Sequence, residues 1–199
     1  MAVHILGGKA RGFPLDTPPE NITRPTAVLL RRRLFDWRQR WDGWHFVDLC
    51  AGSGAMGFEA LSRGAAGVVL NEVHKVAYRV LERNRGKWDE RFPEGPPARL
   101  RQGPFQALLG RLAEVVPREA WLQTVLYFDP PYQEHALYEE FWQLVKQFPG
   151  EVWVESDRLK GPALEAQRQH LSDHVKEVWQ GDHWILVGRA RVDGGEAEG

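Results

Sequence analysis

An acidic residue, two prolines and a tyrosine stand together directly after an apolar segment at 125–128. They are Asp129, Pro130, Pro131 and Tyr132. The prolines restrict the backbone, so the Asp129 carboxylate and the Pro130 carbonyl can offer two hydrogen-bond acceptors to one NH2 group. The ring of Tyr132 offers a flat face for stacking a planar base. The motif indicates chemistry on an amino group of an aromatic ring, although an ordinary strand followed by a Pro-Pro turn has the same letters.

Such an amino nitrogen is a poor nucleophile because its lone pair is delocalised into the ring. Two acceptors that draw its hydrogens favour a more tetrahedral nitrogen, which can attack an activated methyl group without a strong general base. Positioning of this kind can contribute about 7–11 kcal/mol in favourable cases. A paired base cannot reach such a pocket, so the target must be unpaired or flipped out. RNA loops present such bases readily.

A glycine-rich turn forms a second candidate site, between a predicted strand and a predicted helix. Within 47–57, the residues Gly52, Gly54 and Gly57 match the GxGxxG pattern of dinucleotide sites. Asp48 precedes these glycines at the carboxyl end of the strand. A carboxylate at that point opposes a pyrophosphate, but it complements the ammonium and sulfonium groups of S-adenosylmethionine (AdoMet). The turn therefore favours a cationic cofactor.

Glu72 supports the same site, because it closes the next predicted strand 18 residues after Gly54. An acid at that position can accept hydrogen bonds from ribose hydroxyls, a feature that NAD and AdoMet sites share. A solvated strand end is the alternative interpretation of Glu72. Cys50, the single cysteine, is interpreted as a small buried apolar residue and not as a nucleophile.

The elements that must position these residues alternate between strands and helices, as in a doubly wound α/β sheet. Short apolar runs predict strands at 45–49, 68–71, 98–101, 125–128 and 152–155. Helical patterns lie between them at about 54–63, 74–88, 104–115 and 135–147. Gly64 is expected to end the first of these helices. The segments 175–180 and 183–189 are separated only by Gly181 and Asp182, which predicts a hairpin.

The first 40 residues form a basic end on an otherwise acidic chain. They carry eight lysines and arginines against three acids, a net charge of +5, so the remainder of this chain of net charge −1 carries −6. Thr26 is predicted to cap a helix. The apolar stripe of that helix consists of Leu30, Leu34, Trp37 and Trp41. We expect the helix to dock by this stripe and to present guanidinium groups, including those of Arg31 and Arg38, to an anionic partner. A solvated surface helix is the alternative.

Length and composition fit a single domain. The chain has 199 residues, 43% of them hydrophobic, and no apolar stretch approaches the roughly 20 residues of a membrane span. One cysteine permits no internal disulfide and no cysteine-based zinc site, which is typical of a reducing cytoplasm. We expect a soluble, cytoplasmic, monomeric protein without a metal. The expected divisions are a basic RNA-contacting segment at 1–42, an AdoMet-binding methyltransferase domain at 43–191 and a disordered tail at 192–199.

The sequence resembles a bacterial family, the type-D small-subunit rRNA methyltransferases, which make N2-methylguanine in 16S ribosomal RNA. Besides the two motifs, the resemblance rests on the segments 5–12, 24–26, 34–37 and 61–65. It implies a Rossmann-like class I methyltransferase, with a mostly parallel seven-stranded sheet, helices on both faces and a C-terminal antiparallel hairpin. It also implies AdoMet as cofactor and 16S rRNA, or the small ribosomal subunit, as partner.

The same resemblance assigns roles to single residues. The guanine N2 would be oriented by Asp129, Pro130, Pro131 and Tyr132. AdoMet would be held by Asp48, Ala51, Gly52, Ser53, Gly54 and Glu72. The rRNA would be contacted by Lys9, Arg11, Arg24, Thr26, Arg31 and Arg38.

The chain also departs from the family pattern. Ala27 and Val28 stand where an Asp usually follows the Arg-Pro-Thr segment, and Arg32 stands where a Glu is usual. Pro104 replaces the acid or amide that commonly meets the adenine amine, so adenine would depend on the backbone and on packing against Phe105. Three alternatives stay open: an adenine-N6 methyltransferase acting on DNA or RNA, an NAD-type oxidoreductase, and a non-catalytic RNA-binding protein with the same fold.

Overall fold

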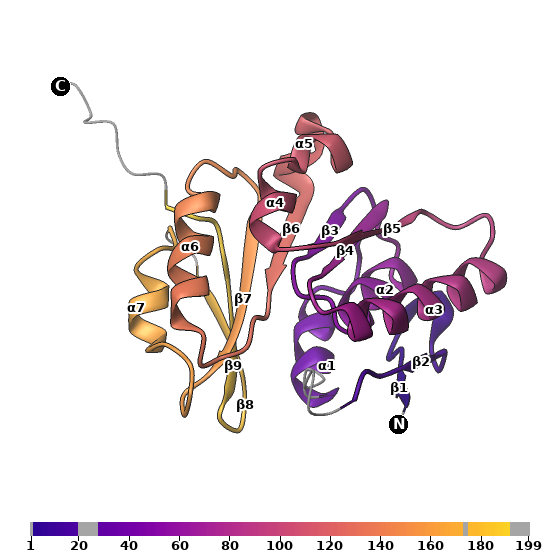
Figure 1. Cartoon of the computed structure of the whole chain (residues 1–199), viewed down its shortest axis with the longest axis horizontal. Helices are drawn as coiled ribbons and strands as arrows, with labels where there is room; N and C mark the ends of the chain where they lie inside the picture. The colour runs from indigo at the N-terminus through magenta and orange to yellow at the C-terminus, as the bar shows by residue number, and fades with distance from the viewer. Residues whose placement is uncertain (1, 20–27, 173–174, 192–199) are drawn as a thin grey trace.

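The fold centres on a seven-stranded sheet with the strand order β5-β4-β3-β6-β7-β9-β8 (Figure 1). The structure, a computed structural model, describes residues 2–19, 28–172 and 175–191. The strands are β3 (His45–Asp48), β4 (Gly67–Glu72), β5 (Ala98–Gln102), β6 (Thr124–Phe128), β7 (Glu151–Asp157), β8 (Lys176–Gln180) and β9 (His183–Gly188). The pairs from β5 to β7 are parallel, and β9 is antiparallel to β7 and β8. The predicted Rossmann-like α/β class, with its closing hairpin, is confirmed.

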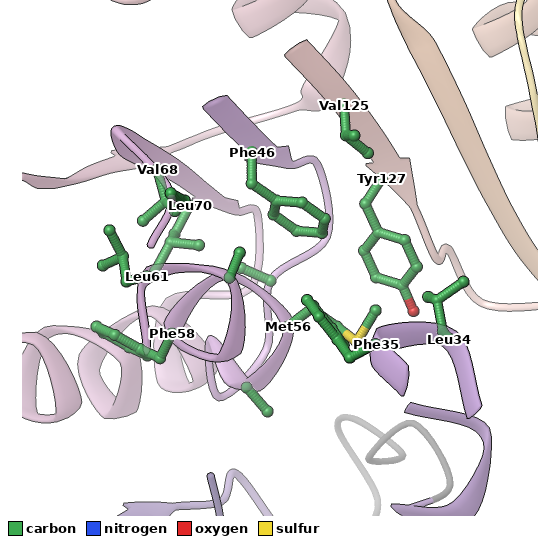
Figure 2. Packing of buried hydrophobic residues seen from close by; sticks show 14 of the residues in the cluster. Leu34, Phe35, Phe46, Met56, Phe58, Leu61, Val68, Leu70, Val125 and Tyr127 are labelled. Atoms are coloured by element: carbon green, nitrogen blue, oxygen red, sulfur yellow. The ribbon is translucent and has the colours of Figure 1, made fainter. Parts of the chain in front are cut away.

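Helices cover both faces of this sheet. One face packs against α1 (Val28–Trp37), α2 (Ala55–Ser62) and α3 (Lys75–Arg91), and the other against α4 (Phe105–Leu109), α5 (Leu112–Val115), α6 (His135–Val145) and α7 (Leu164–Arg168). Successive side chains of a strand point to opposite faces. Phe46 and Val125 therefore belong to the first core, part of which is drawn in Figure 2, whereas Val47 and Leu126 belong to the second. Apolar runs without alternation suit strands buried on both faces.

Two local expectations were wrong. The helix predicted at 104–115 is divided into α4 and α5, because Gly110 ends α4 and Arg111 precedes α5 with non-helical backbone angles. Glycine is a poor interior residue for a helix. Trp41 completes the apolar stripe from outside α1, which ends at Trp37. Trp41 is fully buried, whereas Trp37 is 43% exposed.

The N-terminal residues form a small ribbon that joins the main core. The antiparallel strands β1 (Ala2–His4) and β2 (Pro14–Asp16) flank a turn that contains a short 3-10 helix, η1 (Gly8–Ala10). The segment 5–12 is mainly this turn, and the backbone N–H of Ile5 donates to the Phe13 carbonyl at 3.0 Å. Ile5 and Leu15 are buried in the same core as α1 and α2. Among the described helices, none is both long and apolar enough to cross a membrane.

Candidate active site

Four carboxylates lie along the carboxyl-terminal edge of the sheet. They are Glu72 and Asp48, which end β4 and β3, Asp129, which directly follows β6, and Glu155, which lies two residues before the end of β7. This edge is the usual ligand site of open α/β sheets, because loops from neighbouring strands meet there. No three metal-ligating side chains of the described residues converge closely enough to hold a metal ion. The four carboxyl groups give this edge of the sheet an excess of acidic side chains.

The glycine turn connects β3 to α2 at this edge. Gly52 and Gly54 have φ values of 53° and 82°, a left-handed conformation that side-chain-bearing residues rarely adopt. The backbone N–H of Gly52 donates to Glu72 Oε2 at 2.9 Å, and that of Ala51 donates to the Asn71 carbonyl at 2.7 Å. The end of β4 thus fixes the shape of the turn. Each Glu72 oxygen accepts a backbone N–H, since Oε1 takes that of His74 at 2.7 Å, which leaves further lone pairs for a ligand.

Asp48 is the most deeply buried acid of the turn. Its residue is 1% exposed, and Oδ1 accepts a hydrogen bond from the backbone N–H of Cys50 at 3.2 Å. Burial raises the pKa of Asp48 well above its usual value, and the nearby carboxylates of Glu72 and Glu155 raise it further. A positive charge placed beside Asp48 would offset both effects.

The Asp-Pro-Pro-Tyr corner lies next to the glycine turn. Strands β3 and β6 pair in parallel, and the backbone N–H of Leu49 donates to the Tyr127 carbonyl at 2.9 Å, two residues before Asp129. Cys50 lies between the two motifs: its pKa is raised well above the usual value by burial first, and then by the charges of Asp48, Asp129 and Glu72. The two candidate sites are therefore neighbours, as the strand order predicts.

Tyr132 is held by residues from two other strands. Its hydroxyl donates to Glu155 Oε1 at 3.0 Å and lies 3.2 Å from His183 Nδ1, with the His183 ring edge-on to the tyrosine ring. Burial and the adjacent carboxylates of Asp129 and Glu155 raise the pKa of the Tyr132 hydroxyl. Because the hydroxyl stays protonated and is anchored at both sides, the direction of the ring is fixed. A fixed ring loses less entropy when a base stacks on it.

The two prolines of the corner differ in their surroundings. Pro130 is buried and Pro131 is exposed. The backbone N–H of Glu134 donates to the carbonyl of Pro131 at 2.9 Å, and this turn leads directly into α6. The corner is thereby tied to a helix on one side and to the sheet on the other.

Phe105, expected to pack against adenine, is 6% exposed at the start of α4. Its ring centroid lies 4.8 Å from that of Phe128, inside the second core. Asn71 connects this loop to the glycine turn, because its Nδ2 donates to the carbonyls of Leu49 and Gly103, each at 3.0 Å. Phe105 thus borders the same edge, but nearly all of its surface is buried by the protein, so that only a small part could meet an adenine.

The charges along this edge of the sheet determine whether a positively or a negatively charged ligand can bind there. The turn offers backbone groups with positive φ, and the surrounding side chains supply carboxylates, one of which, Asp48, is destabilised in its charged form by burial. A cation would be stabilised by these groups, whereas a pyrophosphate would be repelled by them. The residues present therefore fit a cationic cofactor and do not fit an anionic dinucleotide.

The expected outward presentation of Arg31 is wrong. Arg31 is 1% exposed, and its Nη2 donates to the His4 carbonyl at 2.7 Å. Burial lowers the pKa of its guanidinium, an effect that the nearby Glu59 opposes. The sequence pattern of one helix could not show that β1 covers this flank. A residue enclosed in this way is not available to grip a phosphate.

Arg38 is also engaged by the protein. Its Nη2 lies 2.5 Å from Glu151 Oε1, and the side chain is 16% exposed. The guanidinium carbon lies 4.1 Å from the ring centroid of Trp44 and within 5.7 Å of three further tryptophan rings. This arrangement pairs the charge and shields it, so it accounts for Arg38 without an RNA partner.

The other predicted RNA contacts fall into two groups. Lys9 and Arg11 are exposed on the turn between β1 and β2, with Lys9 Nζ 5.5 Å from the Phe92 ring centroid. Arg24 and Thr26, including the predicted helix cap at Thr26, lie outside the described residues, as does the predicted tail at 192–199.

Sequence reasoning missed three side chains that shape the site. Glu155 could have been found, because it ends a buried apolar run as Asp48 does. His183 reaches Tyr132 from the hairpin, and Asn84 bonds the Ser53 carbonyl at 2.9 Å from α3. These two have partners 51 and 31 residues away in sequence, so no local pattern identifies them.

Comparison with known families decides the assignment. The family described as Conserved hypothetical protein 95 matches residues 3–176 of the chain. The chain belongs to this family. Among curated proteins, Ribosomal RNA small subunit methyltransferase D of Escherichia coli is 30% identical over 139 residues, which are 69% of this chain and 64% of that enzyme. The Buchnera aphidicola (Acyrthosiphon pisum) protein of the same name is 32% identical over 83 residues, 41% of this chain and 44% of its own length. The resemblance to type-D small-subunit rRNA methyltransferases is thus confirmed.

Several solved structures share the fold over nearly the whole length of this chain. The E. coli protein yhhF, a candidate methyltransferase, has a TM-score of 0.71 at 25% identity and covers 96% of this chain and 99% of its own. A hypothetical protein from Thermus thermophilus has a TM-score of 0.68 at 26% identity, over 94% and 99% of the two chains. A T. thermophilus 16S rRNA methyltransferase, solved with AdoMet and guanosine, has a TM-score of 0.65 over 96% of this chain and 50% of its own. At 14% identity, that likeness shows the fold alone.

Proposed function

We propose that this chain is an AdoMet-dependent methyltransferase that transfers a methyl group to the exocyclic N2 of a guanine in 16S rRNA. One observation carries the proposal. The parallel pairing of β3 with β6 brings a carboxylate-bearing glycine turn and the Asp-Pro-Pro-Tyr corner side by side at one edge of the sheet. A cation-binding site and an amine-binding site are the two sites that this reaction needs.

The glycine turn would hold the cofactor. Asp48 would face the positive groups of AdoMet, and the backbone of 51–54 would surround the cofactor. Glu72 would accept hydrogen bonds from the ribose hydroxyls, and Phe105 would border the adenine. AdoMet supplies the activated methyl group. The carboxylates disfavour the pyrophosphate of a competing dinucleotide by charge, which is why we prefer this function to an NAD-type oxidoreductase.

The corner would hold the base. The Asp129 carboxylate and the Pro130 carbonyl accept the two hydrogens of the N2 amino group, which weakens the delocalisation of its lone pair. The ring of Tyr132, fixed through its hydroxyl by Glu155 and His183, stacks on the guanine. These groups orient the nitrogen, and the positioning does not require a strong general base.

The choice of substrate rests on the relatives. The E. coli and Buchnera proteins are named small-subunit rRNA methyltransferases, and the family that the sequence resembles acts on guanine N2. Exposed Lys9 and Arg11, with Arg24 and Thr26 nearby in sequence, would contact the rRNA backbone. We place the protein in the cytoplasm as a monomer, where it would meet 16S rRNA free or within the small subunit.

The test is transfer of a tritiated methyl group from AdoMet into purified small ribosomal subunits that lack the modification, followed by nucleoside mass spectrometry. We expect N2-methylguanosine. N6-methyladenosine would reassign the enzyme to adenine, because an Asp-Pro-Pro-Tyr corner can also hold that amine. RNA binding without any transfer, under conditions in which AdoMet binds, would indicate a non-catalytic RNA-binding protein.

A further inference from the structure

An apolar side chain protrudes at the carboxyl-terminal edge of the sheet, in the loop that follows β7. Leu159 is 71% exposed, a larger fraction than any other exposed large hydrophobic residue among those described. Its neighbours Arg158 and Lys160 are exposed and basic. Single exposed leucines are common, so exposure alone does not give Leu159 a role.

The loop at 157–161 is held rigidly. Asp157 Oδ1 accepts the backbone N–H groups of Leu159, Lys160 and Gly161 at 3.0, 2.6 and 3.1 Å. These contacts lower the pKa of Asp157 despite the opposing effect of burial. A side chain at Gly161 would overlap Ser156 and Asp157, so the loop is also closely packed. Leu159 is therefore presented to solvent from a fixed backbone.

Two contacts place this loop beside the base-binding corner. His135, which begins α6 three residues after Tyr132, lies 2.8 Å through its Nε2 from the Lys160 carbonyl. On the other side, the backbone N–H of Arg158 donates to the Asp182 carbonyl at 3.0 Å, and the Arg158 side chain pairs with that of Asp182. The next residue, His183, contacts Tyr132. The loop and the β8–β9 turn lie side by side at the lower edge in Figure 1.

We infer that Leu159 contacts the rRNA next to the target base and packs against a nucleobase exposed when the target leaves its stack. The inference rests on the proposed function, which requires an unpaired or flipped-out guanine. Leucine is among the apolar side chains that proteins insert between bases. A fixed loop does not have to be ordered on binding, so its contact is made at low entropic cost. Lys160 would meet an adjacent phosphate.

The test compares Leu159→Ala with Leu122→Ala, a matched control. Leu122 is 56% exposed in η2 (Arg118–Gln123), directly before β6 and hence at the opposite edge of the sheet. Because both leucines are exposed, neither change should affect folding. Affinity for fluorescently labelled 16S rRNA is measured by anisotropy, and affinity for AdoMet by calorimetry. We expect Leu159→Ala to weaken rRNA binding about tenfold, the loss expected when a partly buried leucine side chain is removed from an apolar contact, with AdoMet binding unchanged for both variants.

Equal rRNA affinities of Leu159→Ala and Leu122→Ala would overturn the inference. The binding measurement does not require methyl transfer, so it separates the inference from the proposed function. Wild-type protein that binds rRNA but transfers no methyl group would refute the function, and the comparison of the two leucines would still decide the role of Leu159. In active protein, kcat/KM for small subunits should fall by the same factor as the affinity.

Discussion

The two edges of the sheet differ in how their charged side chains are arranged. At the amino-terminal edge, Arg38 is paired with Glu151 at 2.5 Å and enclosed by tryptophan rings. At the carboxyl-terminal edge, burial raises the pKa of Asp48, and the carboxylates of Glu72 and Glu155 raise it further. One edge contains charges of opposite sign that pair with each other, and the other contains an excess of negative groups. Perturbed groups of the second kind cluster at functional sites.

This difference suggests that the charged groups of the amino-terminal edge serve stability and those of the carboxyl-terminal edge serve ligand binding. An ion pair between two protein side chains contributes to stability, whereas a cluster of carboxyl groups of one sign can be stabilised further by a cationic ligand. Removing a group at the first edge should therefore reduce stability, and removing a group at the second should reduce activity. Each prediction below tests that division, beginning with the largest expected effect.

Asp129→Ala removes one of the two acceptors proposed for the amino group. Methyl transfer should fall by about 10²- to 10³-fold, the usual loss for one essential polar contact in an active site, while AdoMet affinity stays unchanged. Transfer of labelled methyl and calorimetric titration measure the two effects. Asp42→Ala, a change in an exposed acid with 68% side-chain exposure near the amino edge, is the control and should leave transfer intact. Equal losses in both variants would contradict the division.

Arg38→Ala should act on stability. It leaves Glu151 without its partner and opens space among the tryptophans, so the free energy of unfolding should fall by about 2–3 kcal/mol, somewhat below the loss for a fully buried pair. Urea unfolding followed by tryptophan fluorescence measures this change. The salt dependence of rRNA binding should be the same as in the wild type. A slope reduced by about one would instead place Arg38 at a phosphate.

Asp48→Asn should stabilise the free protein while weakening AdoMet binding. Because the folded-state pKa of Asp48 is raised, the stability that this group contributes is complete below the unfolded pKa of about 3.9 and is lost as the pH rises through the folded pKa. Asparagine carries no charge to bury. Its melting temperature should exceed that of the wild type at neutral pH by a few degrees, since 1 kcal/mol corresponds to roughly 2–4 °C at this size.

The pH dependence supplies the control for Asp48→Asn. The gain in melting temperature should disappear below about pH 4, where the wild-type carboxyl is protonated in both states. AdoMet affinity of the wild type should rise with pH as Asp48 loses its proton, and the variant should lack that part of the rise. A lower melting temperature of the variant at neutral pH would show that the charge of Asp48 is already compensated.

Tyr132→Phe should have the smallest effect. The ring remains, but its hydroxyl contacts with Glu155 and His183 are lost. We expect kcat to fall about fivefold through imprecise stacking, since small displacements reduce rates, with AdoMet affinity unchanged. Tyr127→Phe removes a hydroxyl contact to the other oxygen of Glu155 and should affect stability without a comparable loss of kcat. The reverse pattern would assign the anchoring of Tyr132 to stability alone.

The parallel sheet and both motifs could be predicted because their signals are local. Apolar runs, glycines and an acid before two prolines are read from a few neighbouring residues, and the strand order then brings the two motifs together. Arg31 could not be predicted, because its environment depends on β1, 27 residues earlier in sequence. The anchoring of Tyr132 depends similarly on strands 23 and 51 residues later.

The amide of Asn84 has a consequence for the order of folding. Its Nδ2 bonds the carbonyls of Ser53 and Asp16, and its Oδ1 accepts the backbone N–H of Asp16. A chain made from its N-terminus contains the ribbon and the glycine turn well before it contains Asn84. The hydrogen bonds of both regions to Asn84 can form only after α3 has been synthesised. One side chain therefore links the last contacts of both regions to the docking of the same helix.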